Sequence, residues 1–445
     1  MLNEELRSQA IKDSNSIRHQ RYSNRANVPL ENSKRYPWVV VALLWVVALL
    51  NYMDRQMLST MRPSMRIDIE ELNSATNFGY LMGIFLWIYG FTNPFSGFMA
   101  DKLNRKWLII GSLFVWSGVT FLMGFATNFD QLYFLRALMG VSEALYMPAG
   151  LSLIADYHPS KTRSLAIGIH MTGLYVGQAI GGFGATIAKA FTWHTAFHSF
   201  GMVGFIYSIV LIFALKETKK GDEADVSDAV EPGKPGIVSN LKGIGLLFTS
   251  ITFWAILFCF AASSFPGWAT KNWLPTLFSQ KLSIDMAVAG PMSTITIAVS
   301  SFIGVIFGGI LSDRWVQKNL KGRIYTSAIG LTLMIPSLFL IGFGESLFHI
   351  ITAGVCFGLG FGMFDANNLP IVFQFVSVKR RSTAYGIMNM TGIFAGAIIT
   401  DLLGKSTDAG SLGRDFAMIA FVVVAALVIQ LFFLRPKPAS FIDTS

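Results

Sequence analysis

Hydrophobic runs of about twenty residues recur along almost the whole chain, and they restrict its fold more than any other feature. About 20 apolar residues are enough for a helix to cross the hydrocarbon core of a bilayer. The runs cover residues 36–60, 76–100, 106–126, 129–155, 164–188, 195–215, 250–278, 287–312, 323–343, 346–372, 382–403 and 414–434. Only 14% of the residues are charged and 53% are hydrophobic, a balance that water-soluble domains do not have. We therefore expect an all-α membrane protein with twelve transmembrane helices.

The longest polar interruption divides these runs into two sets of six. Residues 216–235 are rich in charge and contain Pro and Gly, which is typical of a flexible linker. We expect a cytoplasmic N-terminal tail, a six-helix bundle, a cytoplasmic linker, a second six-helix bundle and a cytoplasmic C-terminal tail. These segments cover residues 1–35, 36–215, 216–245, 246–435 and 436–445.

Short sequences recur at corresponding places in the two sets of runs. The pattern G-x-x-[acid]-A-x-x-x-P occurs in the fourth and the tenth run, and R-S-x-A-x-G begins the fifth and the eleventh. The matching segments are 140–148 with 362–370, 163–168 with 381–386, and 171–173 with 390–392. Repeats of this kind predict two pseudo-symmetric six-helix bundles, an arrangement common among transporters.

Lysine and arginine gather on one side of the expected membrane. Of the 35 such residues, 26 fall in the tails or in loops on the same side as the tails, and seven on the opposite side. The positive-inside rule therefore places both termini of a multi-pass cell (inner or plasma) membrane protein in the cytoplasm. Because the basic residues follow the membrane side, the net charge of +9 does not indicate a nucleic-acid partner.

Two pairs of charged residues lie well inside apolar runs: Asp54 and Arg55 in the first, and Arg136 and Glu143 in the fourth. A charge at the bilayer centre costs about 2.5–3.5 kcal/mol on insertion scales, so these side chains must face other helices. They either form ion pairs that serve helix packing or build a site for charged solutes or protons. Arg136 and Glu143 are seven residues apart and share one helix face. We expect Asp54 to pair with Arg136, leaving Arg55 free for an anion and Glu143 without a fixed cation.

A repeated loop carries a resemblance to a known family. The segments Gly97-x3-Asp101-x3-Arg105 and Gly309-x3-Asp313-Arg314 resemble the signature loop of the major facilitator superfamily, and the resemblance covers residues 36–435. It implies that Gly97, Asp101, Arg105, Asp313 and Arg314 form a gate motif that helps to hold the cytoplasmic side closed. The glycines are expected to let neighbouring helices approach closely. The simpler alternative is a solvated basic loop.

Within that superfamily, three segments resemble the anion:cation symporters, which include hexuronate, galactonate and sialate carriers. The segments are Asn51-Tyr52-Met53-Asp54-Arg55, Arg136-x3-Gly140-x2-Glu143-x4-Pro148 and Trp273-Leu-Pro275. The resemblance implies that Arg55 anchors the substrate carboxylate, that Asp54 and Glu143 carry protons, and that Arg136 tunes them. A planar guanidinium suits this task because it offers a two-pronged donor that stays charged when buried.

Several further polar residues in the runs are candidates. Those for substrate contact are Tyr52, Tyr89, His170, Asn367 and Asn389. Asn389 resembles a family position that contacts substrate. Asp365 is the repeat partner of Glu143, which makes it a further candidate for proton coupling. Lys271 lies near the outer end of the seventh run, so we expect it to extend to the membrane interface.

These observations predict a secondary active transporter that takes up a small organic anion together with protons by alternating access. A sugar acid such as a hexuronate, an aldonate or a sialate is the expected solute. We expect a monomer in a lipid bilayer, without cofactor or metal. We also expect that the protein is not an enzyme, because no H-E-x-x-H, G-x-S-x-G or Cys/His metal spacing occurs on these runs. A proton antiporter or exporter of organic anions or drugs, a sodium-coupled anion carrier and a non-transporting sensor remain as alternatives. Gln178 stands where the motif of drug/proton antiporters has a proline, so the sequence favours the exporter hypothesis less.

Overall fold

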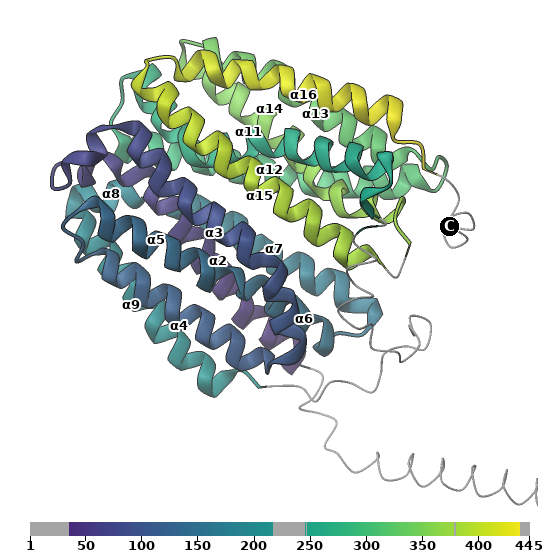
Figure 1. Cartoon of the computed structure of the whole chain (residues 1–445), viewed down its shortest axis with the longest axis horizontal. Helices are drawn as coiled ribbons and strands as arrows, with labels where there is room; N and C mark the ends of the chain where they lie inside the picture. The colour runs from purple at the N-terminus through teal and green to yellow at the C-terminus, as the bar shows by residue number, and fades with distance from the viewer. Residues whose placement is uncertain (1–34, 217–244, 246, 378–379, 437–445) are drawn as a thin grey trace, which may run out of the picture.

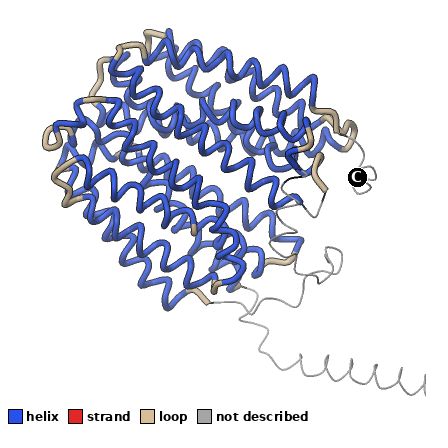
Figure 2. The backbone as a smooth tube through the Cα atoms, viewed as in Figure 1, coloured by secondary structure: helices blue, strands red, loops and turns tan. Residues whose placement is uncertain are grey.

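The computed structural model describes residues 35–216, 245, 247–377 and 380–436, and the regular elements in these ranges are helical (Figure 2). The predicted linker and both predicted tails lie almost entirely outside these ranges. The first set of elements is α2 (Tyr36–Met65), η1 (Glu70–Asn73), α3 (Ala75–Lys102), α4 (Arg105–Met123), α5 (Phe129–Ala144), α6 (Tyr146–Tyr157), α7 (Ser160–Gly181), α8 (Gly184–Ala190) and α9 (Trp193–Ala214). The second set is α11 (Ile251–Leu282), α12 (Met286–Val316), α13 (Gly322–Phe343), α14 (Leu347–Phe373), α15 (Arg381–Asp408) and α16 (Leu412–Phe433).

These helices follow the twelve predicted runs, with the fourth run divided at Leu145 into α5 and α6 and the fifth divided between α7 and α8. Ten of the described spans are long and apolar enough to cross a membrane, counting Phe129–Tyr157 as one. The other two, α3 and α7, have 28 and 22 residues but are more polar. Their polarity has a physical reason, because α3 packs along α15 and α7 packs against α12, so part of each faces protein rather than lipid.

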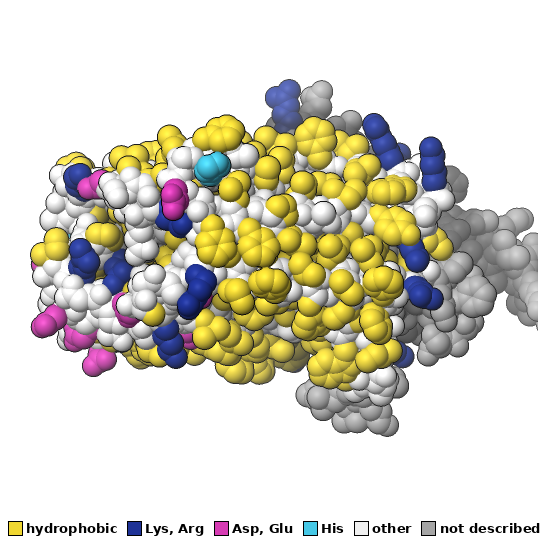
Figure 3. Space-filling model, turned by 90° about the horizontal axis from the view of Figure 1, so that it is seen from above, with side chains coloured by type: hydrophobic (Ala, Val, Ile, Leu, Met, Phe, Trp, Pro, Cys, Tyr) yellow, Lys and Arg dark blue, Asp and Glu magenta, His cyan; other side chains and the backbone are white. Residues whose placement is uncertain are grey.

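The surface has the character that a bilayer requires. Figure 3 shows a wide band of hydrophobic side chains between two ends at which the charged side chains gather. At one end acidic and basic side chains are mixed, whereas Lys and Arg predominate at the other. Large exposed hydrophobic side chains include Phe213, Phe307 and Phe421. Exposure of this much apolar surface is expected where lipid, not water, is the solvent.

The repeated glycines occupy equivalent places in the two halves, α2–α9 and α11–α16 (Figure 1). Gly140 of α5 packs on α3, where a Cβ atom would lie 2.7 Å from the carbonyl oxygen of Phe85. Gly362 of α14 packs on α12 in the same way, against the carbonyl oxygen of Ser301. Helices in membranes approach this closely only where the residue is small. The repeated glycine therefore fixes the same helix crossing once in each half.

The repeated arginines also have the same structural role in each half. The Arg163 side chain donates a hydrogen bond to the carbonyl oxygen of His158, just beyond the end of α6, at 3.3 Å. Arg381 donates to the carbonyl oxygen of Phe373, the last residue of α14, at 3.1 Å. Carbonyl groups at a helix C-terminus lack partners in the helix, and a cation there also interacts favourably with the helix dipole. Each arginine thus caps the helix that precedes it.

The two halves contact each other at one end of the bundle, which we call the distal end. The opposite end, where α2 begins and α9 and α16 end, is the terminal end (Figure 1). Near the terminal end, α3, α7, α12 and α15 each carry a glycine at which a side chain would meet no described atom within 4 Å. These glycines are Gly97, Gly168, Gly309 and Gly386. The halves therefore separate toward the terminal end, and Gly97 and Gly309 do not mediate the close helix contact that we predicted for them.

A carboxylate from one half caps a helix of the other at the distal end. Asp408, the last residue of α15, accepts hydrogen bonds from the backbone N–H groups of Ala75 (2.7 Å) and Thr76 (2.8 Å). It also accepts from the hydroxyl groups of Ser74 (2.8 Å) and Thr76 (2.7 Å). The first N–H groups of α3 have no partner in the helix, and a negative charge is favourable there. This cap joins the two halves.

A second polar contact lies across the same end. Lys189 of α8 donates a hydrogen bond to the carboxylate of Asp285, which precedes α12, at 2.8 Å. Together with the backbone N–H of Ala287, this bond lowers the pKa of Asp285. The pair therefore stays charged in mildly acidic solution. Both side chains are well exposed to solvent, so the contact contributes little by itself.

We expect Asp408→Asn to open the distal end. The substitution removes the charge and one of the two acceptor oxygens, and hydrogen bonds to charged groups contribute about 1.5–3 kcal/mol each. The equilibrium between closed and open distal ends should shift by about tenfold or more. The measurement is the electron-spin distance between labels on cysteines at Ile67 and Leu347, both exposed, in an otherwise cysteine-free protein.

Asp415→Asn is the matched control for this experiment. Asp415 is also a carboxylate near the distal end, but its partners, Ser411 and Arg414, belong to its own half. It should leave the distance distribution unchanged. Equal distributions in Asp408→Asn and in the wild type would show that the cap does not hold the halves together.

Candidate substrate-binding site

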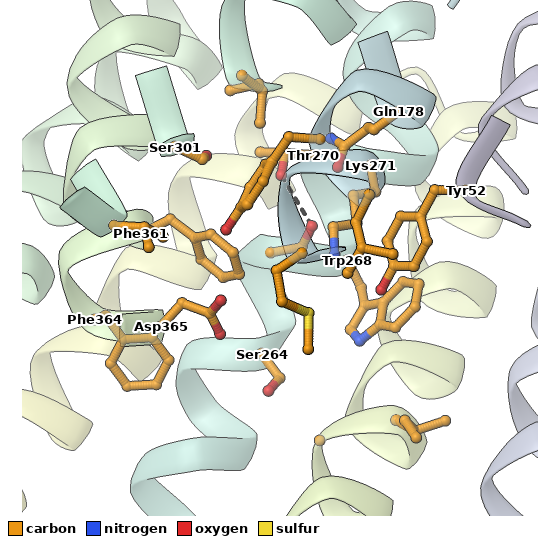
Figure 4. A pocket seen from close by; sticks show the side chains of 18 of the residues that line it. Tyr52, Gln178, Ser264, Trp268, Thr270, Lys271, Ser301, Phe361, Phe364 and Asp365 are labelled. Carbon is orange, nitrogen blue, oxygen red and sulfur yellow. Dashed lines mark hydrogen bonds between the residues drawn. The ribbon is translucent and has the colours of Figure 1, made fainter. Parts of the chain in front are cut away.

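A cavity of about 340 Å³ lies between the two halves (Figure 4). Helices α2 and α7 line it from the first half, and α11, α12, α14 and α15 from the second. Its polar or charged lining residues are Tyr52, Tyr175, Gln178, Ser264, Thr270, Lys271, Ser301, Asp365 and Asn389. A site of this size, with apolar walls and a few convergent polar groups, is typical of small-molecule binding.

Lys271 places a positive charge in this cavity. Its ammonium nitrogen lies 4.8 Å from the centroid of the Trp268 ring and 5.8 Å from that of the Tyr52 ring. Within the described part of the chain, no hydrogen bond or ion pair to this nitrogen is present. The prediction that Lys271 reaches the membrane interface is therefore wrong. The reason is that α11 continues for eleven residues beyond Lys271, about 16 Å of helix, so the residue lies too deep.

The other polar side chains of the cavity carry mainly carboxylate, hydroxyl and amide groups. Asp365 of α14 accepts a hydrogen bond from Asn368 at 3.3 Å, and its carboxylate points into the cavity (Figure 4). Ser301 is buried, and its hydroxyl has no partner among the described residues. Gln178 enters from the first half and Asn389 from α15. Such groups can exchange hydrogen bonds with the hydroxyl groups of a polar solute.

Behind Tyr52, the first half holds a buried ion pair. The Arg55 side chain donates from Nε to a carboxylate oxygen of Glu143 at 2.5 Å, and Asn51 donates to the same oxygen at 2.9 Å. Glu143 and Asn51 have no exposed surface. Three aromatic rings surround the guanidinium carbon, with centroids at 5.0 Å (Tyr52), 4.9 Å (Phe85) and 4.7 Å (Tyr89). Cation–π attraction and the ion pair together stabilise Arg55 here.

The expected pairing of the four intramembrane charges is wrong in this conformation. Asp54 is not bonded to Arg136. It accepts a hydrogen bond from Thr120 at 3.3 Å, whereas Arg136 donates to the sulfur of Met139 at 2.9 Å and lies 4.6 Å from the Phe85 ring centroid. The reason is geometric, because consecutive residues of a helix point about 100° apart. Arg55 can therefore reach Glu143 while Asp54 turns toward α4.

The structure brings together only part of the predicted set. Tyr52, Asp365 and Asn389 line the cavity, and Tyr89 belongs to the rings around Arg55. His170 is buried beside Tyr146, with a centroid distance of 6.0 Å, and Asn367 is buried and bonds to its own helix. These last two residues do not line the cavity, and their contact with substrate stays a prediction.

The contacts of the repeated glycines place Lys271 as the counterpart of Arg55, a correspondence that the structure shows and that the sequence repeats did not reach. Gly173 packs against Ala48 on α2, and its repeat partner Gly392 packs against Ser264 on α11. Arg55 is seven residues after Ala48, and Lys271 is seven residues after Ser264. Because Asp365 is the repeat partner of Glu143, each half carries one cation and one carboxylate in corresponding places.

The predicted gate motif lies at the terminal end. Arg105 forms an ion pair with Asp156 of α6, a partner that the sequence did not suggest, and Asp313 lies 3.9 Å from Arg323. The side chain of Asp101 lies outside the described residues. Gly97 and Arg314 stand in the same region, and the role of the motif in closing this end stays a prediction.

The third predicted segment has a packing role. Trp273 is fully buried, donates from its indole N–H to the carbonyl oxygen of Thr400 at 3.0 Å and contacts Phe78 edge to face. Asn272 adds a hydrogen bond to the hydroxyl of Thr400 at 2.7 Å. This segment therefore fixes α11 against α15 beside the cavity.

Two repeated helical bundles around a cavity that holds buried charges define a multi-pass membrane transporter. A family model described as Major Facilitator Superfamily matches residues 44–400. The chain therefore belongs to the Major Facilitator Superfamily.

Relatives and solved structures agree with this assignment. The hexuronate transporter of Bacillus subtilis (strain 168) is 26% identical over 421 residues, covering 90% of this chain and 96% of the relative. The chloroplastic ascorbate transporter of Arabidopsis thaliana is 27% identical, covering 89% and 74%. The crystal structure of a bacterial homologue of the human lysosomal transporter Spinster, inward-facing and occupied, superposes with a TM-score of 0.72 at 18% identity, covering 89% and 97%. This chain is thus similar to organic anion carriers of the superfamily.

We expect Arg55→Lys to weaken binding of the solute. Lysine keeps the charge but loses the planar, two-pronged donor that suits the carboxylate of a solute. Disturbing a buried charge pair typically costs about 2 kcal/mol or more, roughly thirtyfold in affinity. The measurement is a calorimetric titration with the sugar acid that most raises the melting temperature of the wild type.

Arg414→Lys is the control, because Arg414 also pairs with a carboxylate, Asp415, but is exposed at the distal end. It should bind the acid like the wild type. An Arg55→Lys protein of unchanged affinity would exclude Arg55 as an anchor.

Proposed function

We propose that this transporter takes up a small organic anion, a sugar acid, together with protons by alternating access. The observation that carries the proposal is Lys271, a cation in a cavity between the halves without a bonded partner among the described residues. A cation held away from bulk water is stabilised by an anion, and a carboxylate provides both charge and hydrogen-bond acceptors. The transport of hexuronate and ascorbate by the named relatives supports the same class of solute.

The remaining polar groups of the cavity support a polyhydroxylated solute. Asp365, Asn389 and Gln178 offer acceptors and donors at the places that a carboxylate bound to Lys271 would leave free. Carboxylate and amide side chains can each accept hydrogen bonds from hydroxyl groups. Such an arrangement suits a sugar acid better than an apolar drug.

Arg55 and Glu143 supply the chemical basis for proton coupling in this proposal. The carboxylate of Glu143 is bonded to Arg55 and Asn51, and its second oxygen is buried without a partner among the described residues. A proton on Glu143 would remove the charge that holds Arg55 and would release the guanidinium for a substrate carboxylate. Proton binding and substrate binding would then favour each other. Asp54 and Asp365 are the further candidates for carrying protons, with Arg136 tuning Asp54 and Glu143.

The orientation in the membrane follows from the charge bias. Lys and Arg predominate at the terminal end of the surface (Figure 3), so we place this end and both termini in the cytoplasm of a cell-membrane protein. With the distal end closed, the described conformation then faces inward. We further propose that the transporter works as a monomer, because each chain holds both halves of the cavity.

Lys271→Met tests the observation that carries the proposal. Methionine keeps most of the apolar stem but removes the charge, so affinity for the sugar acid should fall by about thirtyfold or more. The measurement is competition for uptake in proteoliposomes by the acid and by its neutral alcohol analogue. Lys405→Met, at an exposed lysine of α15 outside the cavity, should behave like the wild type. Equal competition by acid and alcohol would show that the solute is not recognised as an anion.

Glu143→Gln tests coupling. Glutamine resembles the protonated acid permanently, so exchange of labelled for unlabelled solute should survive, while accumulation under an inward proton gradient should fail. The two activities are measured side by side in proteoliposomes, with sodium replaced by potassium at fixed pH to exclude a sodium-driven carrier. If the variant concentrates solute as well as the wild type, Glu143 is not the coupling residue.

A further inference from the structure

Three aromatic rings lie near the ammonium group of Lys271, and no hydrogen bond to this group is present among the described residues. The centroids of Trp268, Tyr52 and Phe361 lie 4.8, 5.8 and 5.9 Å from the nitrogen. Figure 4 shows the Trp268 indole beside Lys271, with the Phe361 ring across the cavity and the Asp365 carboxylate farther away. A carboxylate bound to Lys271 would therefore place the adjoining carbon atoms against ring faces.

The Trp268 ring is held in a fixed position. Its indole packs against Gly396 of α15, where even a Cβ atom would overlap the ring. Because helix α15 supports one side of the indole, the ring cannot move away from the cavity in that direction. The part of the ring exposed to the cavity is thus a rigid apolar surface next to the cation.

A pyranose ring fits this surface, whereas an open chain does not. In a cyclic uronate the carboxylate is attached directly to the ring, whose C–H groups carry partial positive charge and can lie on the negative face of an aromatic ring. The hydroxyl groups project around the rim, where Asp365, Asn389 and Gln178 stand. In an open-chain aldonate, the hydroxyl groups nearest the carboxylate would face the aromatic rings and lose their hydrogen bonds to water. The open chain would also lose more rotational freedom on binding.

Resting on the function proposed above, we infer that the cavity selects sugar acids in the cyclic pyranose form over open-chain sugar acids, and that Trp268 is the residue that determines this specificity. Lys271 binds the carboxylate of both classes, and the indole face distinguishes the cyclic acids from the open-chain acids. An aromatic contact of this kind contributes about tenfold in affinity.

The test is calorimetric titration of the full-length purified protein with matched acids. The cyclic probes are methyl glucuronide and methyl galacturonide, whose rings cannot open, and the open-chain probes are gluconate and galactonate. We expect the better cyclic acid to bind at least about tenfold more tightly than the better open-chain acid. An open-chain acid that binds as tightly as the cyclic acids would overturn the inference.

Substitutions connect this preference to Trp268. Trp268→Leu should lower the affinity for the cyclic acid by about tenfold and leave the affinity for the open-chain acid nearly unchanged. Trp268→Phe should retain most of the preference for the cyclic acid. Trp254→Leu is the control, since Trp254 is on the same helix but 51% exposed and outside the cavity. Equal weakening of both classes by Trp268→Leu would mean that the indole only supports the site and would also overturn the inference. If no acid of either class binds the wild type, the proposed function itself fails.

Discussion

The arrangement of this transporter depends on one constraint, the cost of a charge that is removed from water. In the first half, Arg55, Glu143 and Asn51 satisfy it with a bonded cluster that three aromatic rings enclose. In the second half, Lys271 has no such bonded partner within the described residues, and it faces a cavity instead. The polar helices α3 and α7 are then turned toward the other half, since only protein or water can solvate their polar groups.

The two halves show how one repeated plan serves two purposes. Arg55 and Lys271 occupy corresponding places, as do Glu143 and Asp365, yet of these two cation–carboxylate pairs only Arg55 and Glu143 form an ion pair within 4 Å. Aspartate is one methylene shorter than glutamate, and lysine lacks the fork of arginine. The first half therefore carries a closed pair that an added proton could open, and the second carries separated charges that a solute could bridge.

Much of the architecture was predictable, because it depends on local sequence. The helices and their arrangement as two repeated halves follow from hydrophobic length and from repetition. The partners of the buried charges were not predictable in the same way. Whether Arg55 meets Glu143, and whether Asp54 meets Thr120 instead of Arg136, depends on which helices adjoin. Lys271 was misplaced because the end of its helix was judged from hydrophobicity alone, and its correspondence to Arg55 depends on helix contacts that only the structure shows.

The closed distal end and the open cavity both belong to one of the two arrangements between which the halves are in equilibrium. Asp408 and Lys189 join the halves at that end through a few hydrogen bonds, so the closure can be reversed without unfolding any helix. A solute changes such a balance only through interactions that differ between the two arrangements. Arg55 and Lys271 both lie close to the centroid of the Tyr52 ring (5.0 and 5.8 Å) and belong to different halves. An anion that contacts both would therefore have different binding energies in the open and the closed arrangement, and a proton on Glu143 would decide whether Arg55 can take part.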